Sequence, residues 1–334
     1  MALSDEREAG AALGGRDQSG GEGAGAPAPT GGDLLSWALL MALGLIWGGS
    51  FTLVGFAVDS LPPLTVAATR LIIGAAALIP LAFWLGDGLP WIGDAYGRAF
   101  WLSALGVAFA ANAAPFALLS WALTITPSGL GGVFMATVPL IVLPLAARFT
   151  PGEPMTLRRT LGFLIGFAGV VALIGVDALG DLGGGGWEIL AQLACLAVAC
   201  GYAVGSILTK RAPPSHSLSF GAAAIGLAAL MLIPPTLALE QPFAAPWSLE
   251  SAVAVLFLGL LPTALAAVLL FIVVRRRGPG FLSLVNYLVP LWALGFGVAL
   301  LGEAMPAQTP IALGLILAGV FIAQSKARPH ASAR

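Results

Sequence analysis

The stretch from Leu34 to Val58, LLSWALLMALGLIWGGSFTLVGFAV, runs for 25 residues without a charged side chain. An α-helix rises 1.5 Å per residue, so about 20 apolar residues cross the hydrocarbon core of a bilayer. This stretch therefore predicts a transmembrane helix that begins directly after Asp33.

The composition of the whole chain agrees with a membrane protein. Of 334 residues, 58% are hydrophobic and 9% are charged, and the formal net charge is −1. A typical soluble domain carries about 25% charged residues, so a water-soluble enzyme of this size would expose wide apolar surfaces. The near-neutral charge also offers no basic surface for nucleic acid. We therefore expect the lipid bilayer as a partner and no nucleic acid.

Further apolar runs follow the first, separated by breaks rich in Pro and Gly. They predict an all-α integral membrane protein with ten transmembrane helices, near residues 34–57, 64–85, 99–124, 128–149, 157–176, 187–209, 218–239, 249–274, 279–301 and 308–325. The weakest boundary is Thr126-Pro127-Ser128, where one long kinked helix would reduce the number to nine.

The positions of the charges favour ten helices. With ten, 14 of the 15 Lys and Arg residues fall on one side of the membrane, and the exception is Arg70 inside the second helix. In the loops on the other side, all the charged residues are acidic: Asp59, Asp177, Asp181, Glu240 and Glu303. Because basic loops stay in the cytoplasm, we expect a multi-pass protein of the cell inner membrane with both termini cytoplasmic.

Residues 1–33 are rich in Gly and Ala and contain no aromatic side chain. Such a segment cannot bury enough apolar surface to fold, so it is predicted to be a disordered cytoplasmic tail. Residues 326–334 are predicted to form a second cytoplasmic tail.

The chain repeats itself after about 150 residues. Gly152-Glu153-Pro154-Met155 returns as Gly302-Glu303-Ala304-Met305, and Val138-Pro139-Leu140 returns as Val289-Pro290-Leu291. These matches predict two five-helix repeats, residues 34–176 and 187–325. An odd number of helices per repeat places the two halves in opposite orientations, which is typical of secondary transporters with a substrate site between the repeats.

The segment Ile46-Trp47-Gly48-Gly49-Ser50-Phe51, followed by Pro62-Pro63 and Arg70, resembles the EamA type of the drug/metabolite transporter superfamily. The duplicated segments from Pro139 to Glu153 and from Pro290 to Glu303 resemble its repeat unit. The resemblance covers about residues 36–324. It implies ten helices and the transport, often the export, of amino acids, other metabolites or small drugs. The second half departs from the pattern, with Ala224 in place of Arg70 and Tyr202 in place of Trp47.

Uncharged polar and aromatic side chains within the spans are the candidate substrate-binding residues, because buried amides and hydroxyls in lipid need partners. They suit a neutral or zwitterionic metabolite with an apolar part. The candidates are Trp47, Ser50, Asn112, Trp121, Tyr202, Ser206, Asn286 and Tyr287. The alternatives are helix packing or an interfacial belt for the Trp residues, and hydrogen bonds between helices for the Asn residues.

Arg70 lies about seven residues into its span. We expect it to meet an anionic group in the pathway. The alternatives are that it extends to the membrane interface or bonds backbone carbonyls. Glu153 and Glu303 end equivalent helices, and we expect a structural or gating role for both. Pro139 and Pro290 interrupt equivalent helices and are candidate hinges, with static kinks as the alternative.

No Asp, Glu, His or Lys lies near the middle of any predicted span. We therefore expect no catalytic residue, metal or cofactor and no dedicated midplane proton carrier, while facilitation and coupling through acids such as Glu303 stay open. The predicted function is a secondary transporter that exports a small metabolite, such as an amino acid or a drug-like compound, by alternating access. The alternatives are a membrane sensor or scaffold without transport, and an integral-membrane enzyme. The oligomeric state is left open, a homodimer included.

Overall fold

The computed structural model describes residues 34–149, 154–174 and 186–324, and every regular element in these ranges is a helix. The predicted tails, Glu153, Asp177 and Asp181 lie outside the described residues.

The first half begins with α1 (Leu34–Val58) and α2 (Pro63–Leu85). Next come α3 (Ala95–Val107), the π-helix η1 (Ala108–Ala113) and α4 (Ala114–Ala122), followed by α5 (Ser128–Met135), α6 (Val138–Phe149) and α7 (Leu157–Ile174). The second half contains α9 (Trp187–Arg211), α10 (Ser217–Leu239), α11 (Leu249–Gly259), the π-helix η2 (Leu260–Leu265), α12 (Ala266–Leu282), α13 (Val285–Leu301) and α14 (Thr309–Gln324).

Seven helical stretches of the described chain are long and apolar enough to cross a bilayer: α1, α2, α3–η1–α4, α5–α6, α9, α10 and α11–η2–α12. Two further apolar helices, α13 and α14, are shorter. The prediction of an all-α, multi-pass membrane protein is confirmed.

Two predicted helix starts differ from the observed ones by four residues or more. The third span begins at Ala95, four residues early, because the Asp94 side chain caps the helix by accepting a hydrogen bond from the Gly97 N–H at 2.6 Å. The ninth span was predicted from residue 279, but α13 begins at Val285. Gly278 has a left-handed φ of 79° that breaks the helical path, and residues 279–282 continue α12 across this kink.

A π-helix interrupts the third span of each half, which the sequence reasoning did not predict. A π turn widens the helix by one residue and often marks a functional site. In each turn a polar side chain bonds the carbonyl five residues earlier. Asn112 Nδ2 donates to Val107 O at 3.1 Å, and Thr263 Oγ1 donates to Leu258 O at 2.9 Å.

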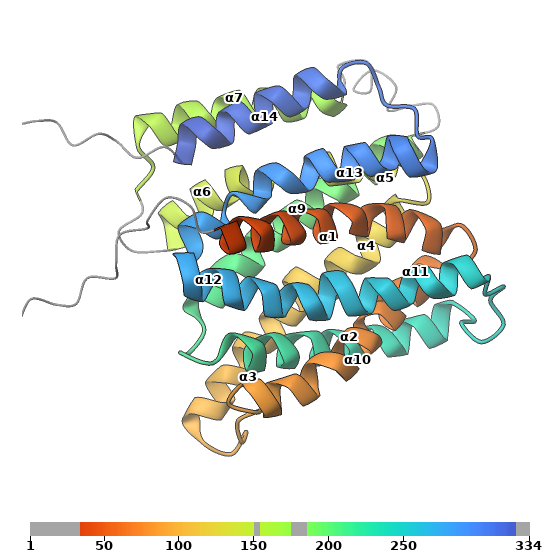
Figure 1. Ribbon diagram of the computed structural model, residues 1–334, viewed down its shortest axis with the longest axis vertical. Coiled ribbons are helices and arrows are strands. Elements are labelled where there is room, and N and C mark those ends of the chain that lie inside the picture. The colour runs from red at the N-terminus through yellow and green to blue at the C-terminus, as the bar shows by residue number, and fades with distance from the viewer. Residues whose placement is uncertain (1–33, 150–153, 175–185, 325–334) are drawn as a thin grey trace, which may run out of the picture. The chain divides into compact units, whose positions relative to one another are not determined.

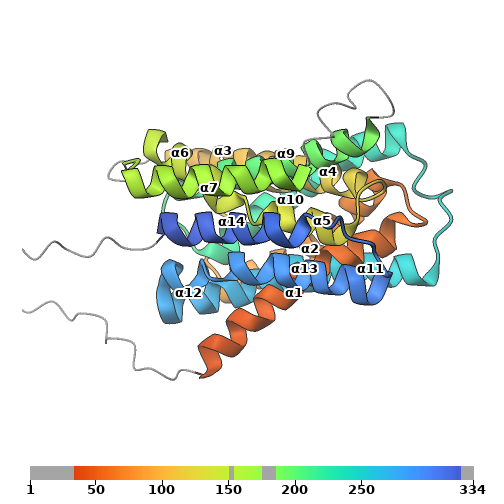
Figure 2. The ribbon, with the colours of Figure 1, turned by 90° about the horizontal axis from the view of Figure 1, so that it is seen from above.

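The two halves are interlocked through their helix contacts. At one edge of the helical body α7 packs on α14, and toward the opposite edge α2 packs on α10 (Figure 1). Between them α1 contacts α11 and α13 of the second half, while α9 contacts α4 and α6 of the first (Figure 2). Equivalent helices thus make equivalent contacts across the halves, and the interface between the halves runs through the centre of the body.

Candidate functional site

A cavity of about 710 Å³ lies between the two halves. Its walls come from α1 to α6 with η1 in the first half, and from α9, α10, η2, α12 and α13 in the second. Six of the predicted site residues line it: Trp47, Ser50, Arg70, Asn112, Tyr202 and Asn286.

The cavity extends toward one end of the helices only. Thr209, Pro213, Ser215 and Ser217, around the connection from α9 to α10, line it. None of the described residues that connect α1 to α2, α4 to α5 or α10 to α11, at the other end, does so. The α9–α10 connection is next to Lys210 and Arg211, on the side that the charge pattern predicts to be cytoplasmic.

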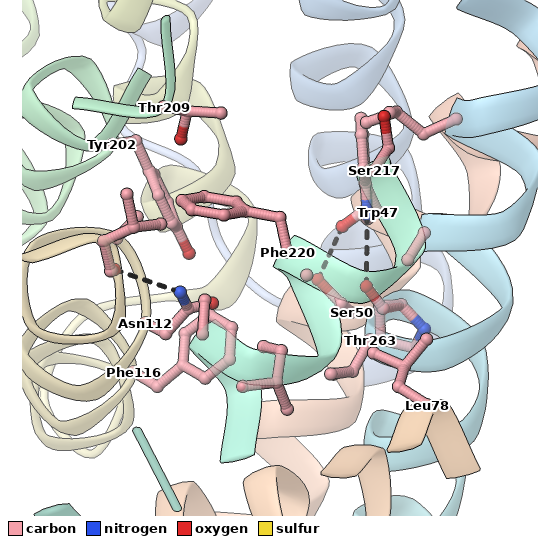
Figure 3. A pocket seen from close by; sticks show the side chains of 18 of the residues that line it. Trp47, Ser50, Leu78, Asn112, Phe116, Tyr202, Thr209, Ser217, Phe220 and Thr263 are labelled. Carbon is pink, nitrogen blue, oxygen red and sulfur yellow. Dashed lines mark hydrogen bonds between the residues drawn. The ribbon is translucent and has the colours of Figure 1, made fainter. Parts of the chain in front are cut away.

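Trp47 links α1 of the first half to the π turn of the second. Its indole Nε1 donates to Pro262 O at 3.2 Å, while Ser50 Oγ donates to Trp47 O one turn away at 2.6 Å (Figure 3). The next residue, Gly48, lets α1 approach α13 closely, because a side chain there would collide with Trp292 Cβ. The indole therefore has a fixed position in the cavity wall.

The opposite wall carries a tyrosine and an amide. Figure 3 shows the Tyr202 hydroxyl pointing toward Asn112, next to the ring of Phe220. Because Asn112 Nδ2 bonds the Val107 carbonyl, its Oδ1 remains as an acceptor for a ligand. Asn286 is arranged in the same way, with Nδ2 donating to Ser283 O at 3.0 Å.

Arg70 is buried, with 6% of its surface exposed, and lines the cavity instead of extending to the interface. Its Nε donates to Thr263 Oγ1 at 3.1 Å, and its guanidinium carbon lies 3.9 Å from the centre of the Phe116 ring. Among the described lining residues it is the one charged side chain.

Three predicted binding residues lie away from the cavity. Trp121 packs edge-on against Trp187, with ring centroids 6.4 Å apart. Ser206 is exposed and bonds the Ala203 carbonyl of its own helix, and the Tyr287 hydroxyl lies 3.5 Å from Gln324 Oε1 on α14.

The proline candidates stand beside cavity residues without lining the cavity. Pro290 is buried inside α13, next to Val289. Pro139 is the second residue of α6, directly after the break at Ala136 and Thr137.

At the end of the helices that the cavity does not reach, two carboxylates cap helices of the first half. Glu303 accepts hydrogen bonds from the backbone N–H groups of Ser128 at 2.6 Å and Gly129 at 2.9 Å, at the start of α5. Glu240 accepts from the N–H groups of Leu64 at 2.9 Å and Thr65 at 2.7 Å, at the start of α2. Each negative charge meets the positive end of a helix dipole.

For Glu303 the sequence predicts a structural or gating role. In the structure it caps α5, about 175 residues earlier in the chain.

The sequence reasoning also missed Thr263, Phe116 and Glu240. Thr263 had a signal, because between Ser251 and Arg275 it is the one hydroxyl, amide or charged residue. Phe116 and Glu240 had none, since an aromatic residue in a span and an acid in a loop are ordinary. The described residues contain no group of three or more His, Cys, Asp or Glu that could hold a metal ion.

The chain matches the EamA-like transporter family twice, over residues 35–175 and 185–324. It belongs to this family. The resemblance drawn from the Trp47–Gly48 segment and the duplicated motifs is therefore confirmed, and the EamA-like chain carries two repeats of the family unit.

Several relatives of this EamA-like chain have names that describe transport. The uncharacterized inner membrane transporter YedA of Escherichia coli strain K12 is 28% identical, over 85% of this chain and 88% of its own. The aromatic amino acid exporter YddG of Ancylobacter novellus is 27% identical, over 85% and 95%. A protein of Streptantibioticus cattleyicolor named "Probable terminal-alkyne amino-acid exporter" is 27% identical, over 86% and 92%.

A solved crystal structure has the same fold, with a TM-score of 0.60 at 22% identity over 87% of this chain and 97% of the other. The chain is therefore a multi-pass membrane protein of a transporter family.

Proposed function

We propose that the protein is a secondary transporter of the cell inner membrane that moves a small metabolite outward by alternating access. The observation that carries this proposal is the cavity of about 710 Å³ between two repeats, which extends toward one end of the helices only. The names of two relatives, both amino-acid exporters, support an amino acid or a drug-like compound as the substrate.

The proposed topology has ten spans. It adds α7, α13 and α14 to the seven longer stretches and divides the chain into a tail (1–33), two five-helix repeats (34–176 and 187–325) and a second tail (326–334). Both termini are proposed to be cytoplasmic, because the basic residues then gather on one side. In this topology the cavity opens to the cytoplasm, and Glu240 and Glu303 lie at the external end.

Outward opening then requires the two carboxylate caps to separate from α2 and α5. Both caps join the second half to the first, so a rocking motion between halves breaks them together. Pro290 within α13 and Pro139 at the start of α6 are proposed hinges, since a proline leaves a backbone carbonyl without its helical partner.

The proposed binding residues are those on the cavity: Trp47, Ser50, Arg70, Asn112, Tyr202 and Asn286. They combine apolar and aromatic surface with a few polar groups, which is the usual composition of small-molecule sites.

Counterflow in liposomes tests the transport function. Purified protein is reconstituted, loaded with an unlabelled candidate metabolite and offered the labelled compound outside, starting with aromatic amino acids. We expect accumulation that protein-free liposomes lack. Absence of counterflow for every metabolite in a broad panel would contradict transport and favour a sensor, a scaffold or an enzyme.

Variants of the cavity test the site. We expect Asn112→Ala, Asn286→Ala and Tyr202→Phe to lower counterflow without lowering the membrane yield. Ser206→Ala serves as the matched control, because Ser206 is exposed and away from the cavity. Unchanged transport in all three cavity variants would refute the site.

A further inference from the structure

The guanidinium of Arg70 has most of its hydrogen-bonding capacity unused. It offers five N–H donors in a fixed planar fork. One of them, at Nε, is taken by Thr263 Oγ1, and no other hydrogen bond or ion pair joins Arg70 to the described residues. The two terminal nitrogens have no partner among the described residues, yet they are not fully shielded from solvent. They therefore border the cavity that Arg70 lines.

The neighbours of Arg70 hold this fork in one orientation. Thr263 Oγ1 donates its own proton to Leu258 O at 2.9 Å, so its lone pairs are turned toward Arg70 Nε. The ring of Phe116 covers one face of the guanidinium at 3.9 Å. The site is thus preorganised for a planar acceptor with two oxygens, and a carboxylate matches this geometry.

The Tyr202 hydroxyl provides a further donor. Tyr202 lines the same cavity as Arg70, and its hydroxyl makes no hydrogen bond to any described residue. In Figure 3 the hydroxyl ends inside the cavity, facing the side of Phe116 and Asn112. An anion in the cavity would therefore find a second donor on α9.

The charge of the cavity is unbalanced. None of the described residues that line it is an Asp or a Glu, so Arg70 leaves one positive charge among walls that are mainly apolar. An unpaired charge in a low-dielectric environment is costly, and a ligand with one negative charge removes that cost. A cationic ligand would add to it, and the ammonium of a zwitterion would find only neutral acceptors such as Asn112 Oδ1.

We propose that the cavity binds an organic monoanion, with a carboxylate on the Arg70 fork and an apolar body between Phe116, Phe220 and Ile225. This inference rests on the proposed transport function and names its substrate class: monoanions bind better than zwitterions, which bind better than cations. Within the proposed range of substrates it favours an acid without an ammonium group over the amino acids named for two relatives.

Matched ligands test the charge preference. The purified full-length protein in detergent is titrated with acids and their primary amides: benzoate and benzamide, 3-phenylpropionate and 3-phenylpropanamide, hexanoate and hexanamide. L-phenylalanine and phenethylamine add a zwitterion and a cation with the same ring. Apparent affinity is read from ligand-induced thermal stabilisation. We expect at least one acid to bind about tenfold tighter than its amide.

Variants assign this preference to Arg70. In Arg70→Gln we expect the preferred acid to lose about tenfold or more in affinity, while its amide changes by less than about twofold. Arg98→Gln is the matched control, since Arg98 is exposed and bonds Gly93 O. If Arg70→Gln does not fold, Arg70→Lys and Thr263→Val replace it. The first keeps the charge without the fork, the second removes the orienting hydroxyl, and both should reduce the preference for the acid.

Three results would overturn the proposal: no acid binding better than its amide, L-phenylalanine or phenethylamine binding better than 3-phenylpropionate, or a preference that survives Arg70→Gln. Counterflow separates this failure from failure of the proposed function. A protein that transports the amide or the amine keeps its function and refutes only the anion site.

Discussion

At the scale of single residues, polar groups from distant parts of the chain complete one another. Glu303 and Glu240 accept hydrogen bonds from four backbone N–H groups at the starts of α5 and α2, in the other half of the chain. Helix N-termini have such unpaired donors, and a carboxylate is their best partner. These two side chains thus join the two halves at one end.

Removing either charge should loosen that end. We expect Glu303→Gln and Glu240→Gln each to weaken the closure by about 1–2 kcal/mol, because a hydrogen bond from a backbone N–H to a carboxylate is stronger than one to an amide. That corresponds to about a 5- to 30-fold shift toward the open form. The measurement is labelling of Leu130→Cys by an impermeant thiol reagent, with Cys195 and Cys200 replaced by Ser.

Leu130 is 2% exposed and lies one residue beyond the Glu303 cap. The control is Glu250→Gln, since Glu250 is an exposed acid in the first turn of α11, at the same end. Equal labelling rates in all three Gln variants would contradict a gating role for the caps. A second route to the same effect is Gly297→Ala, because a side chain on Gly297 would collide with the Glu303 carboxylate.

At the scale of elements, glycine decides how closely α7 and α14 approach. Gly162 on α7 faces the Gly319 carbonyl and Ala323 of α14, and a Cβ on either glycine would collide with the other helix. In a bilayer, helices associate through such close packing of small residues rather than through the hydrophobic effect. The three glycines of α7 are Gly162, Gly166 and Gly169, and a side chain at each would collide with a neighbouring helix. Close helix packing therefore explains why glycine occurs at these positions.

A large side chain in this contact should separate the two helices. We expect Gly319→Leu to destabilise the detergent-purified protein by about 1–3 kcal/mol, the usual cost of overpacking. Thermal unfolding measures the change. Gly314→Leu on the same helix is the matched control, because nothing lies within 4 Å of a Cβ at Gly314. Similar unfolding temperatures for both variants would refute the close contact.

The π-helices belong to the same scale. Each adds one residue to a turn, and each brings its polar residue, Asn112 or Thr263, to the cavity wall. A regular α-helix over the same residues would rotate the remainder of the span by about 100°, so Trp121 and the other residues after η1 would present different faces.

At the scale of the whole molecule, the two halves depend on each other. Their main helix pairs, α2 with α10 and α7 with α14, join one half to the other, and the described helices form one compact unit. Neither half encloses the cavity alone, since both supply its lining.

We therefore expect residues 1–180 and 181–334, expressed separately, to be degraded, and their co-expression to restore membrane protein. Each half alone would expose the faces that pack against the other half, including glycine contacts and helix starts that need carboxylate caps. Immunoblots of membrane fractions measure this. Stable accumulation of either half alone would show that the halves fold independently.

The proposed topology has its own test. Reporter fusions at Asp177 and Arg276 should indicate opposite sides of the membrane, with Asp177 external and Arg276 cytoplasmic. Paired reporters, one active only inside and one only outside, give the answer. The same side for both fusions would exclude ten spans with this orientation.

Much of the fold was predictable because its signals are local or additive. The apolar run from Leu34 to Val58 and the duplicated Gly-Glu motif are properties of the chain itself, and they indicated a membrane protein, a repeat and a family. Helix ends were harder, because Asp94 and Gly278 act through single hydrogen bonds and single φ angles. The π turns left no pattern in the apolar periodicity.

Only the tertiary structure decided which polar residues share a cavity. Tyr202 and Ser206 stand four residues apart on one helix, yet one lines the cavity and the other is exposed. Residues four apart share one face of a helix, so the rotation of α9 does not separate them. What lies against each turn of α9 separates them, and packing between the helices sets this. The same reason explains why Arg70 meets Thr263 across 193 residues and why Glu303 meets Ser128 across 175. The sequence alone determined the membrane environment, the duplication and the family, whereas packing between the halves determined the cavity, its single charge and its closed end.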